Sequence, residues 1–565
     1  MKKDNYTKFL AGLIASTALF FSGCGNSENF VFTNTGPSVI PVNNAPVAVD
    51  DSFAALGNAT VNQIAANGVL TNDTLNGGTI SSFDSVGSQG GAIVLNADGS
   101  FSYTPVFGFV GAETFTYTLS NADGDSTATV TMTSTGRGFF VDNTAPDGGD
   151  GSQASPFDTL SEATAASASG DTVFVARGNG TSTGLSGAVT LKDGVNLIGE
   201  GSGLVLAQTI VAPGQAPLLT GPINCGGNNT VSGIDLQGST ADSIVINGVG
   251  NVTIDNTSSG DPTEQHIDID NATGSVTVSD CVFGDLTVGG LDYVGIDQDS
   301  VGANFVFTNN SFTNSSGNNP GNAVDFQATG TSADFTMVYS GNTVTSVDTT
   351  DDFDNALEVD SDQDGGSFAL TSDNNVITRA DLNGMNIDSI QDNVSLSGSI
   401  TNNMISDIGD QAGLDLDGNN GTWTITGNII DNCADYCIGL FSNGMGGTYI
   451  VENNQLSNAV NGITVADSNG GDIFVAVRGN TIQNASVYSM TFVQGNPFDF
   501  CAVITNNTVS DDLNFSNFGS NSFDVEQFGN AMGDGLAAIN TLNGASINIG
   551  ANPVNSVAQG ACALP

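Results

Sequence analysis

An asparagine followed two residues later by an apolar residue recurs through the second half of the chain. It is found at Asn310, Asn342, Asn375, Asn403, Asn428, Asn454, Asn480 and Asn507. The intervals between these asparagines are 32, 33, 28, 25, 26, 26 and 27 residues, as in a solenoid with variable loops. Successive rungs of a parallel β-helix stack about 4.8 Å apart, so equivalent residues lie over one another. The motif therefore predicts a ladder of asparagine amides, with a bend between each asparagine and the following apolar residue.

The composition agrees with an all-β fold. Gly (73 residues) greatly outnumbers Pro (14), and the hydrophobic fraction of 39% is enough to fill a core. Asp and Glu number 59 against 8 Lys and Arg. Such a surface repels nucleic acid and attracts divalent cations, so we expect no nucleic-acid partner.

A second set of positions aligns once the rungs are superimposed. Segments such as HIDID (266–270) and GLDLD (413–417) alternate apolar and acidic residues, so the acids face solvent. This acidic stripe contains Asp268, Asp270, Asp297, Asp325, Glu358, Asp360, Asp388, Asp415 and Asp417. Two like charges about 5 Å apart repel by about 3 kcal/mol at an effective dielectric constant near 20. Bound cations, raised pKa values or high salt would offset the repulsion; the alternative is a solvated face whose carboxylates splay apart.

One acidic segment has calcium-loop spacing. In DSDQDG, Asp360, Asp362 and Asp364 stand at positions 1, 3 and 5, and Gly365 allows a tight turn at position 6. Position 12 is Thr371 rather than Glu, so the segment is not an EF-hand. We expect calcium as a cofactor in a β-helix turn, with a plain acidic loop as the alternative.

The N-terminus has the layout of an export signal. Residues 1–23 contain lysines followed by a short apolar run, which is typical of a secretory signal peptide. The run ends in FSGC, which resembles the lipobox of bacterial lipoproteins and implies a lipid on Cys24. The resemblance implies a secreted, lipid-anchored protein of the bacterial cell envelope, at the outer membrane or cell surface. An ordinary signal peptide is the alternative. Polar, aperiodic residues 24–43 predict a flexible tether.

Residues 44–135 show alternating strands and frequent turns. Four segments occur in order: NNAPVAVDDSF, VLTND, DGSFSYTP and GFVGAETFTYTLSNADG. This order resembles the cadherin-like, Ig-like module of large bacterial surface proteins. The resemblance implies a β-sandwich that acts as a spacer or adhesive unit. Leu75 and Asn76 stand where members often carry acids, which argues against calcium in this module.

The segment 136–180 begins a new domain. TLSE at 159–162 matches a capping box before an Ala-rich turn, and predicts a short helix. The segment resembles the start of right-handed parallel β-helix proteins of the pectate-lyase-like superfamily, in which a helix covers the open end of the solenoid. The predicted fold is therefore all-β: an N-terminal Ig-like β-sandwich, then a right-handed parallel β-helix over 136–565, with a tail or cap from about residue 513.

The cysteines fit an exported protein. Six follow Cys24: Cys225, Cys281, Cys433, Cys437, Cys501 and Cys562. This number permits three disulfides, whose pairing the sequence leaves open. For Cys433 and Cys437 we expect a disulfide or two thiols rather than a metal pair. Cys562, near the C-terminus, hints that the tail folds back.

The superfamily includes polysaccharide lyases and hydrolases. A lyase needs a strong base, but the bases beyond the start of the β-helix are dispersed in the sequence: Arg177, Lys192, Arg379 and Arg478. We interpret His266 as structural. A glycoside hydrolase needs two carboxylates, and residues i and i+2 of a strand have suitable spacing.

The candidate catalytic pairs are therefore Glu358 with Asp360 and Asp415 with Asp417. Nothing in the sequence distinguishes one pair, and Trp423, the only Trp, provides little of the aromatic platform that sugar binding favours. We therefore predict a cell-surface lipoprotein with a structural or adhesive role, which presents an acidic, calcium-binding face to a glycan or cell-surface protein. A polysaccharide-degrading enzyme is the alternative.

Overall fold

The computed structural model describes residues 44–518 apart from 207, 300, 316–319, 348–351, 390–393, 418–420, 443–445, 468–470 and 496–498, and then residues 523–526, 547–549, 555–557 and 562. The predicted signal peptide (1–23), Cys24 and the tether (24–43) lie outside the described residues. β-strands account for 56% of the structure and helices for 2%, which confirms the predicted all-β class.

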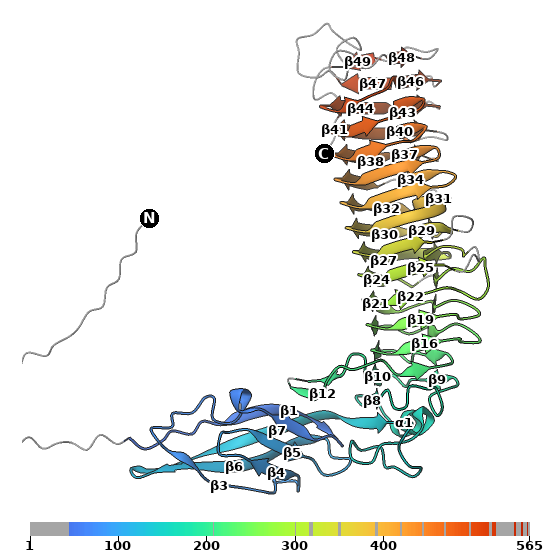
Figure 1. Ribbon diagram of the computed structural model, residues 1–565. Helices are drawn as coiled ribbons and strands as arrows, with labels where there is room; N and C mark the ends of the chain where they lie inside the picture. The colour runs from blue at the N-terminus through green and yellow to red at the C-terminus, as the bar shows by residue number, and fades with distance from the viewer. Residues whose placement is uncertain are drawn as a thin grey trace, which may run out of the picture. The chain divides into compact units, whose positions relative to one another are not determined.

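The first strands form a two-sheet β-sandwich (Figure 1). They are β1 Asp51–Gly57, β2 Val61–Gln63, β3 Thr79–Phe83, β4 Ala92–Leu95, β5 Phe101–Thr104, β6 Gly111–Asn121 and β7 Gly124–Val141, with a 3₁₀ turn at Ala65–Asn67. One sheet contains β1, β3, β6 and β7, and the other contains β2, β4 and β5. Every second residue of a strand shares a face, so β6 buries Phe115, Tyr117 and Leu119 in the core between the sheets.

Strand β7 passes from the sandwich into the next domain without a break. Its first part pairs antiparallel with β6, and its last residues, Gly138–Val141, pair in parallel with β8 (Thr172–Val175). Phe140 of this last part packs with Leu56 of the sandwich and Phe174 of β8. The strand thus crosses residue 136, where the sequence predicts a domain boundary.

Beyond β7 the chain winds into a parallel β-helix of about twelve turns, as predicted (Figure 1). Each complete turn contributes strands to three parallel rows, named here sheets 1, 2 and 3. Sheet 1 contains β8, β10 Asn196–Gly199, β15 Thr230–Ser232, β18 Val252–Asp255, β21 Gly274–Ser279, β24 Ala303–Thr308, β27 Thr331–Ser340, β30 Asp364–Asp373, β32 Ser395–Thr401, β35 Thr422–Thr426, β38 Gly447–Glu452, β41 Ile473–Arg478, β44 Phe500–Thr505, β47 Phe523–Glu526 and β49 Asn555–Val557.

Sheets 2 and 3 are joined through the long strand β31 (Val376–Asp388). Sheet 2 also contains β13 Leu218–Leu219, β16 Asp235–Gln237, β19 Ser258–Gly260, β22 Val282–Phe283, β25 Ser311–Asn314, β28 Thr343–Ser346, β33 Met404–Ile408, β36 Ile429–Cys433, β39 Gln455–Ser457, β42 Thr481–Gln483 and β45 Thr508–Val509. Sheet 3 also contains β9 Val189–Thr190, β14 Ile223–Asn224, β17 Ile244–Asn247, β20 Ile267–Asp270, β23 Val294–Gln298, β26 Val324–Ala328, β29 Phe353–Ser361, β34 Ala412–Leu416, β37 Tyr436–Ser442, β40 Asn461–Asp467, β43 Tyr488–Gln494, β46 Leu513–Asn517 and β48 Ile547–Ile549. A hairpin of β11 (Leu204–Val205) and β12 (Thr209–Val211) stands apart from these rows.

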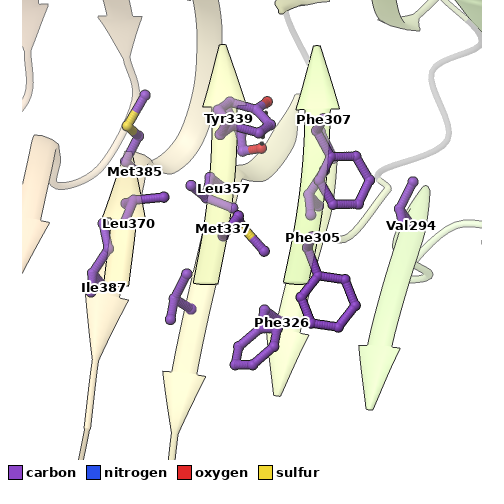
Figure 2. Close-up of a cluster of buried hydrophobic side chains, with 14 of the residues drawn as sticks. Val294, Phe305, Phe307, Phe326, Met337, Tyr339, Leu357, Leu370, Met385 and Ile387 are labelled. Carbon is purple, nitrogen blue, oxygen red and sulfur yellow. Dashed lines mark hydrogen bonds between the residues drawn. The ribbon is translucent and has the colours of Figure 1, made fainter. Parts of the chain in front are cut away.

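The core of the β-helix is a set of apolar columns. Phe305, Met337 and Leu370 occupy equivalent positions of β24, β27 and β30, and all three are at most 1% exposed (Figure 2). Burying one side chain of this size contributes about 2 kcal/mol. Because each turn covers the next, the core is continuous along the solenoid.

The predicted asparagine ladder is confirmed from Asn310 to Asn507. The Oδ1 of Asn454 accepts hydrogen bonds from the backbone N–H and the Nδ2 of Asn428, both at 2.9 Å. The Nδ2 of Asn454 donates to Asn480 Oδ1 and to the carbonyl of Ile425, also at 2.9 Å. Asparagines of adjacent turns are linked in this way at every step of the ladder.

The expected bend lies elsewhere. The residue before each ladder asparagine has a left-handed backbone, with φ between 55° and 71°, and is always Asn or Gly: Asn309, Gly341, Asn374, Asn402, Gly427, Asn453, Gly479 and Asn506. These two residue types adopt that conformation at least cost. Asn428 and Ile430 both point inward, because residues i and i+2 of a strand share a face. The prediction of a bend between them is wrong, since the turn precedes the asparagine.

The predicted capping helix is α1 (Leu160–Ala166). Thr159 is its N-cap: its hydroxyl accepts the N–H of Glu162 at 3.4 Å and donates to the Glu162 carboxylate at 2.7 Å. Leu160 and Ala163 are buried in the same core as the first turns of the β-helix. In the described part of the chain, no helix is long and apolar enough to cross a membrane.

The cysteines divide into two groups. Cys501 and Cys562 form a disulfide across 61 residues, which brings Cys562 back to β44, as its position in the sequence suggested. The thiols of Cys225, Cys281, Cys433 and Cys437 are free and buried. Cys433 and Cys437 are therefore two thiols, the second of the two arrangements expected for them.

Candidate functional site

The acids of the predicted stripe lie on the outer side of sheet 3, in two columns, although Asp325 is only 7% exposed and does not face solvent as predicted. The first column reads Asp268, Gly295, Asp325, Glu358, Asn386 and Asp415. The second reads Asp270, Asp297, Gln327, Asp360 and Asp388, and it continues to Asp417, whose N–H donates to the carbonyl of Ile387. The β-helix thus brings all nine predicted acids together. This surface is called the acidic face below.

Neutral residues interrupt both columns and hold some of the acids. The Nε2 of Gln327 donates to Asp325 Oδ2 at 2.9 Å, and the Nδ2 of Asn386 donates to Glu358 Oε1 at 3.1 Å. These amides break up the runs of stacked acids and supply hydrogen bonds to the charged form of their neighbours. They relieve part of the repulsion predicted from the sequence.

Protonation relieves another part of the repulsion between the stacked acids. Burial, followed by the charge of Asp292, raises the pKa of Asp325 to about 7. Burial and neighbouring acids likewise raise the pKa of Asp360 to about 7, and the pKa values of Asp268 and Asp415 to about 6. Raised pKa values are thus one compensation that this surface uses.

Three carboxyls of the acidic face have a buried oxygen that accepts no hydrogen bond. These atoms are the Oδ1 of Asp325, Asp360 and Asp415. A buried anionic oxygen without a donor favours the neutral acid. The pKa values of all three carboxyls, like that of Asp268, are raised to about 6 or 7.

The carboxylates of the predicted calcium loop are only partly brought together. Asp360 and Asp362 lie close enough for the second to raise the pKa of the first, whereas Asp364 is exposed at the start of β30. Among the described residues, one group of three acids has ligand oxygens within 4.8 Å of one another, and it is Asp147, Asp158 and Glu162 beside α1. The DSDQDG loop does not form such a group.

The two candidate catalytic pairs differ in their surroundings. Glu358 is held by amides, because its Oε2 accepts from Asn355 Nδ2 at 2.5 Å and its Oε1 from Asn386. Asp415 accepts the hydroxyl of Tyr436 on Oδ2 at 2.9 Å. Asp415 is therefore the carboxyl of the acidic face that lies beside an aromatic ring.

The sequence interpretation missed this aromatic group. The rings of Tyr436 and Phe441 lie 5.4 Å apart, edge to face, over the outer side of β37. They converge above Gly439, where a Cβ would come within 2.2 Å of Tyr436 and 2.6 Å of Phe441. Trp423, the residue considered for this role, is completely buried. The sequence contained one signal for this group. In CIGLF, Gly439 and Phe441 stand at the two outward positions that acids occupy in the preceding turns.

A second ladder of amides was also missed. Asn322 Oδ1 accepts from the backbone N–H and Nδ2 of Asn355, and Asn355 Oδ1 accepts from the N–H of Asn383. These asparagines precede Asp325, Glu358 and Asn386 by three residues each, a spacing that is visible in the sequence. They anchor the edge of the acidic face.

Basic groups lie away from the acidic face. The ion pairs in the described part of the chain are Arg137–Asp171 and Arg478–Glu452, and neither involves an acid of this face. Lys192 donates to the carbonyls of Ala165 and Ser167 at the end of α1, where the helix dipole favours a cation. Arg379 donates to the Val347 carbonyl.

Arg177 lines a groove of about 340 Å³ with Asp235 and Ser258. His266 is completely buried, and its Nε2 donates to the Gly284 carbonyl, so its Nδ1 accepts from Ser259. Burial lowers the pKa of His266 to about 3, so it is neutral and structural, as interpreted from the sequence.

Comparison with known proteins identifies the first domain. Residues 43–136 match the sequence profile of the bacterial cadherin-like domain. Among solved structures, the chain is similar to "Crystal structure of pectate lyase Pel9A" at 12% identity and a TM-score of 0.35, over 61% of this chain and 78% of that one. It is also similar to "Rhamnogalacturonan lyase" at 12% identity and a TM-score of 0.30, over 56% and 81% respectively. The activities in these names are those of the two lyases. No curated protein matches the chain.

Proposed function

We propose that this chain is a structural or adhesive protein of the bacterial cell surface, which presents its acidic face through bound calcium to an extracellular glycan. The observation that carries the proposal is the acidic face itself: two columns of acids on adjacent turns, with the ion pairs Arg137–Asp171 and Arg478–Glu452 of the described residues lying outside it. A lyase would need a base at such a surface. Membrane attachment through Cys24 and its lipid remains part of the proposal.

Calcium suits the chemistry of this face. The ion takes six to eight oxygen ligands in flexible geometry, and carboxylates are its preferred protein ligands. Asp360 and Asp388 are in register on adjacent turns, so their backbones are about 4.8 Å apart. An ion held by such a pair keeps open positions that hydroxyl groups of a glycan can fill.

The test is binding of the full chain to a glycan array in calcium and in EDTA. We expect at least one glycan of the array to bind in calcium and not in EDTA, and its binding to weaken by at least tenfold in the double variant Asp360→Asn with Asp388→Asn. The matched control is Asp123→Asn with Asp125→Asn, which removes the same charge from exposed residues of the sandwich. Binding that is equal in calcium and EDTA would contradict the proposal.

A second candidate function is hydrolysis of a neutral glycan. It is favoured by Asp415, whose pKa of about 6 suits a general acid, with Asp417 two residues further along the chain. Release of soluble sugar from a panel of neutral polysaccharides, abolished in Asp415→Asn, would establish this activity in place of the adhesive one. Absence of product throughout the panel is the result expected for an adhesive protein.

A further inference from the structure

The acidic face ends in a surface of different chemistry. Gly439 follows Asp415 in the first column, and Thr464 and Thr491 follow Gly439. In the second column, Phe441, Ala466 and Val493 occupy the outward positions of the same turns. Tyr436 and Phe441 therefore lie at the border between charged and uncharged turns.

The two rings form a shaped platform because Gly439 has no side chain. A Cβ at Gly439 would collide with both rings, so the glycine lets them settle onto the strand. Both rings are partly exposed, in contrast to the aromatic residues of the core. The platform is therefore open to a ligand on its outer side.

Polar groups surround the platform on the acidic side. The hydroxyl of Tyr436 donates to Asp415 Oδ2 at 2.9 Å, which fixes the ring and leaves the phenolic oxygen free to accept. Asp417 follows Leu416, which is in register with Leu440, so it lies one turn below Phe441. Burial, and then the charge of Asp415, raise the pKa of Tyr436, with a smaller contribution from Asp417, so the phenol stays protonated.

We propose that Tyr436 and Phe441 form a binding site for an uncharged hexose ring, with Asp417 as an acceptor for its hydroxyls and Asp415 as a positioning residue. The C–H bonds on one face of a hexose carry slight positive charge and stack on the negative face of an aromatic ring. Hydroxyl groups at the rim of the same sugar donate well to a carboxylate. Tyr436 and Phe441 provide the ring for stacking, and Asp417 provides the carboxylate for the hydroxyls.

Charge selects the class of sugar. Asp388 and Asp415 belong to neighbouring turns of the acidic face, and no Lys or Arg pairs with either of them among the described residues. A uronate would meet repulsion there. The site differs from the calcium-bridged contact of the proposed function, because stacking and direct hydrogen bonds need no metal ion.

The experiment is calorimetric titration of the full chain with cellohexaose, mannohexaose and tri-galacturonate, in EDTA. We expect one of the two neutral oligosaccharides to bind and the galacturonate not to bind. Phe441→Leu, which keeps the apolar volume but removes the ring, should weaken binding at least tenfold. Tyr436→Phe should weaken it by about threefold to fivefold, because the ring stays but loses its anchor.

The matched control is Tyr488→Phe, at the equivalent position two turns away, where Thr491 and Val493 replace Gly439 and Phe441. It should bind as the unaltered chain does. Absence of binding by both neutral sugars, tighter binding of galacturonate, or unchanged affinity in Phe441→Leu would each overturn the site. Because EDTA is present throughout, these outcomes are independent of the calcium-dependent binding that tests the proposed function.

Discussion

Asn428 shows how one buried amide connects three turns of the β-helix. It donates from its backbone N–H and Nδ2 to Asn454, and it accepts both donors of Asn403 on its own Oδ1. The ladder therefore satisfies every polar group of a side chain that is 1% exposed. The residue before Asn428 has a left-handed backbone conformation, and the chain turns there so that the amide side chain points inward.

Asn428→Ala removes the acceptor for two buried donors of Asn403. Each unsatisfied buried donor costs about 1–3 kcal/mol, so we expect the β-helix to lose about 3 kcal/mol of stability. The backbone N–H of Asn403 should exchange with deuterium much faster in the variant than in the unaltered chain. The control Thr422→Ala, at an exposed residue of the same turn, should leave exchange unchanged. Equal protection of Asn403 in both variants would contradict the role given to the ladder.

Asp325 couples the stability of the β-helix to pH. Its pKa in the folded chain, about 7, lies above the value of about 3.9 for an unfolded aspartate. The folded state binds more protons between these values, so stability is full below pH 4 and is lost as the pH rises through 7.

Asp325→Asn removes this loss, because an amide does not titrate. The melting temperature of the variant should fall less between pH 4.5 and pH 8 than that of the unaltered chain. Asp410→Asn, at an exposed acid, is the control and should keep the original slope. If the melting temperature changed equally with pH in all three proteins, the raised pKa of Asp325 would be contradicted.

For a physical reason, the sequence predicted which acids share the acidic face but did not predict that Tyr436 and Phe441 lie beside it. Period-two alternation reveals which residues of a strand face outward, so the nine acids were found. It does not reveal which ring leans over a glycine in the same strand. Tyr436 and Phe441 became a pair only when the register placed them around Gly439.

At the scale of single elements, strong local signals predicted structure reliably. The capping box at Thr159 predicted α1, and the eight asparagines predicted the ladder. That each asparagine directly precedes a strand of sheet 2 was not predicted. The junction of the two domains was less visible, because β7 is one continuous strand that satisfies both the sandwich and the β-helix. A change in composition along the chain can therefore fall within a single continuous strand.

The disulfide between Cys501 and Cys562 fixes the tail to β44. Closing a loop of 61 residues restricts the unfolded chain by about 4 kcal/mol. Reductant should therefore lower the melting temperature of the unaltered chain, and Cys562→Ser should melt at that lower temperature with or without reductant. The other described cysteines are free, so they provide no second reducible bond. Insensitivity of the unaltered chain to reductant would contradict the pairing.

At the scale of the whole molecule, repetition converts a local pattern into a surface. One alternating strand with an outward acid is ordinary, but stacking in register extends it into two charged columns. Part of the resulting repulsion is met by amides and part by protonation. The remaining charge is what we propose that calcium neutralises.

Attachment to the envelope is a separate prediction. Cys24 precedes the described residues, and its lipid is predicted from FSGC alone. Cys24→Ser should move the protein from the detergent-soluble membrane fraction to the soluble fraction of cells. Retention of the variant in the membrane fraction would remove the lipid anchor from the proposal.

Calorimetric titration of the full chain with calcium alone, at pH 7.5, tests most directly whether the acidic face is a cation-binding surface. We expect saturable binding that stabilises the β-helix against heat, and that weakens at least tenfold when Asp360 and Asp388 are both changed to Asn. Saturable binding that survives this double change, or no binding above that expected from diffuse screening, would contradict it.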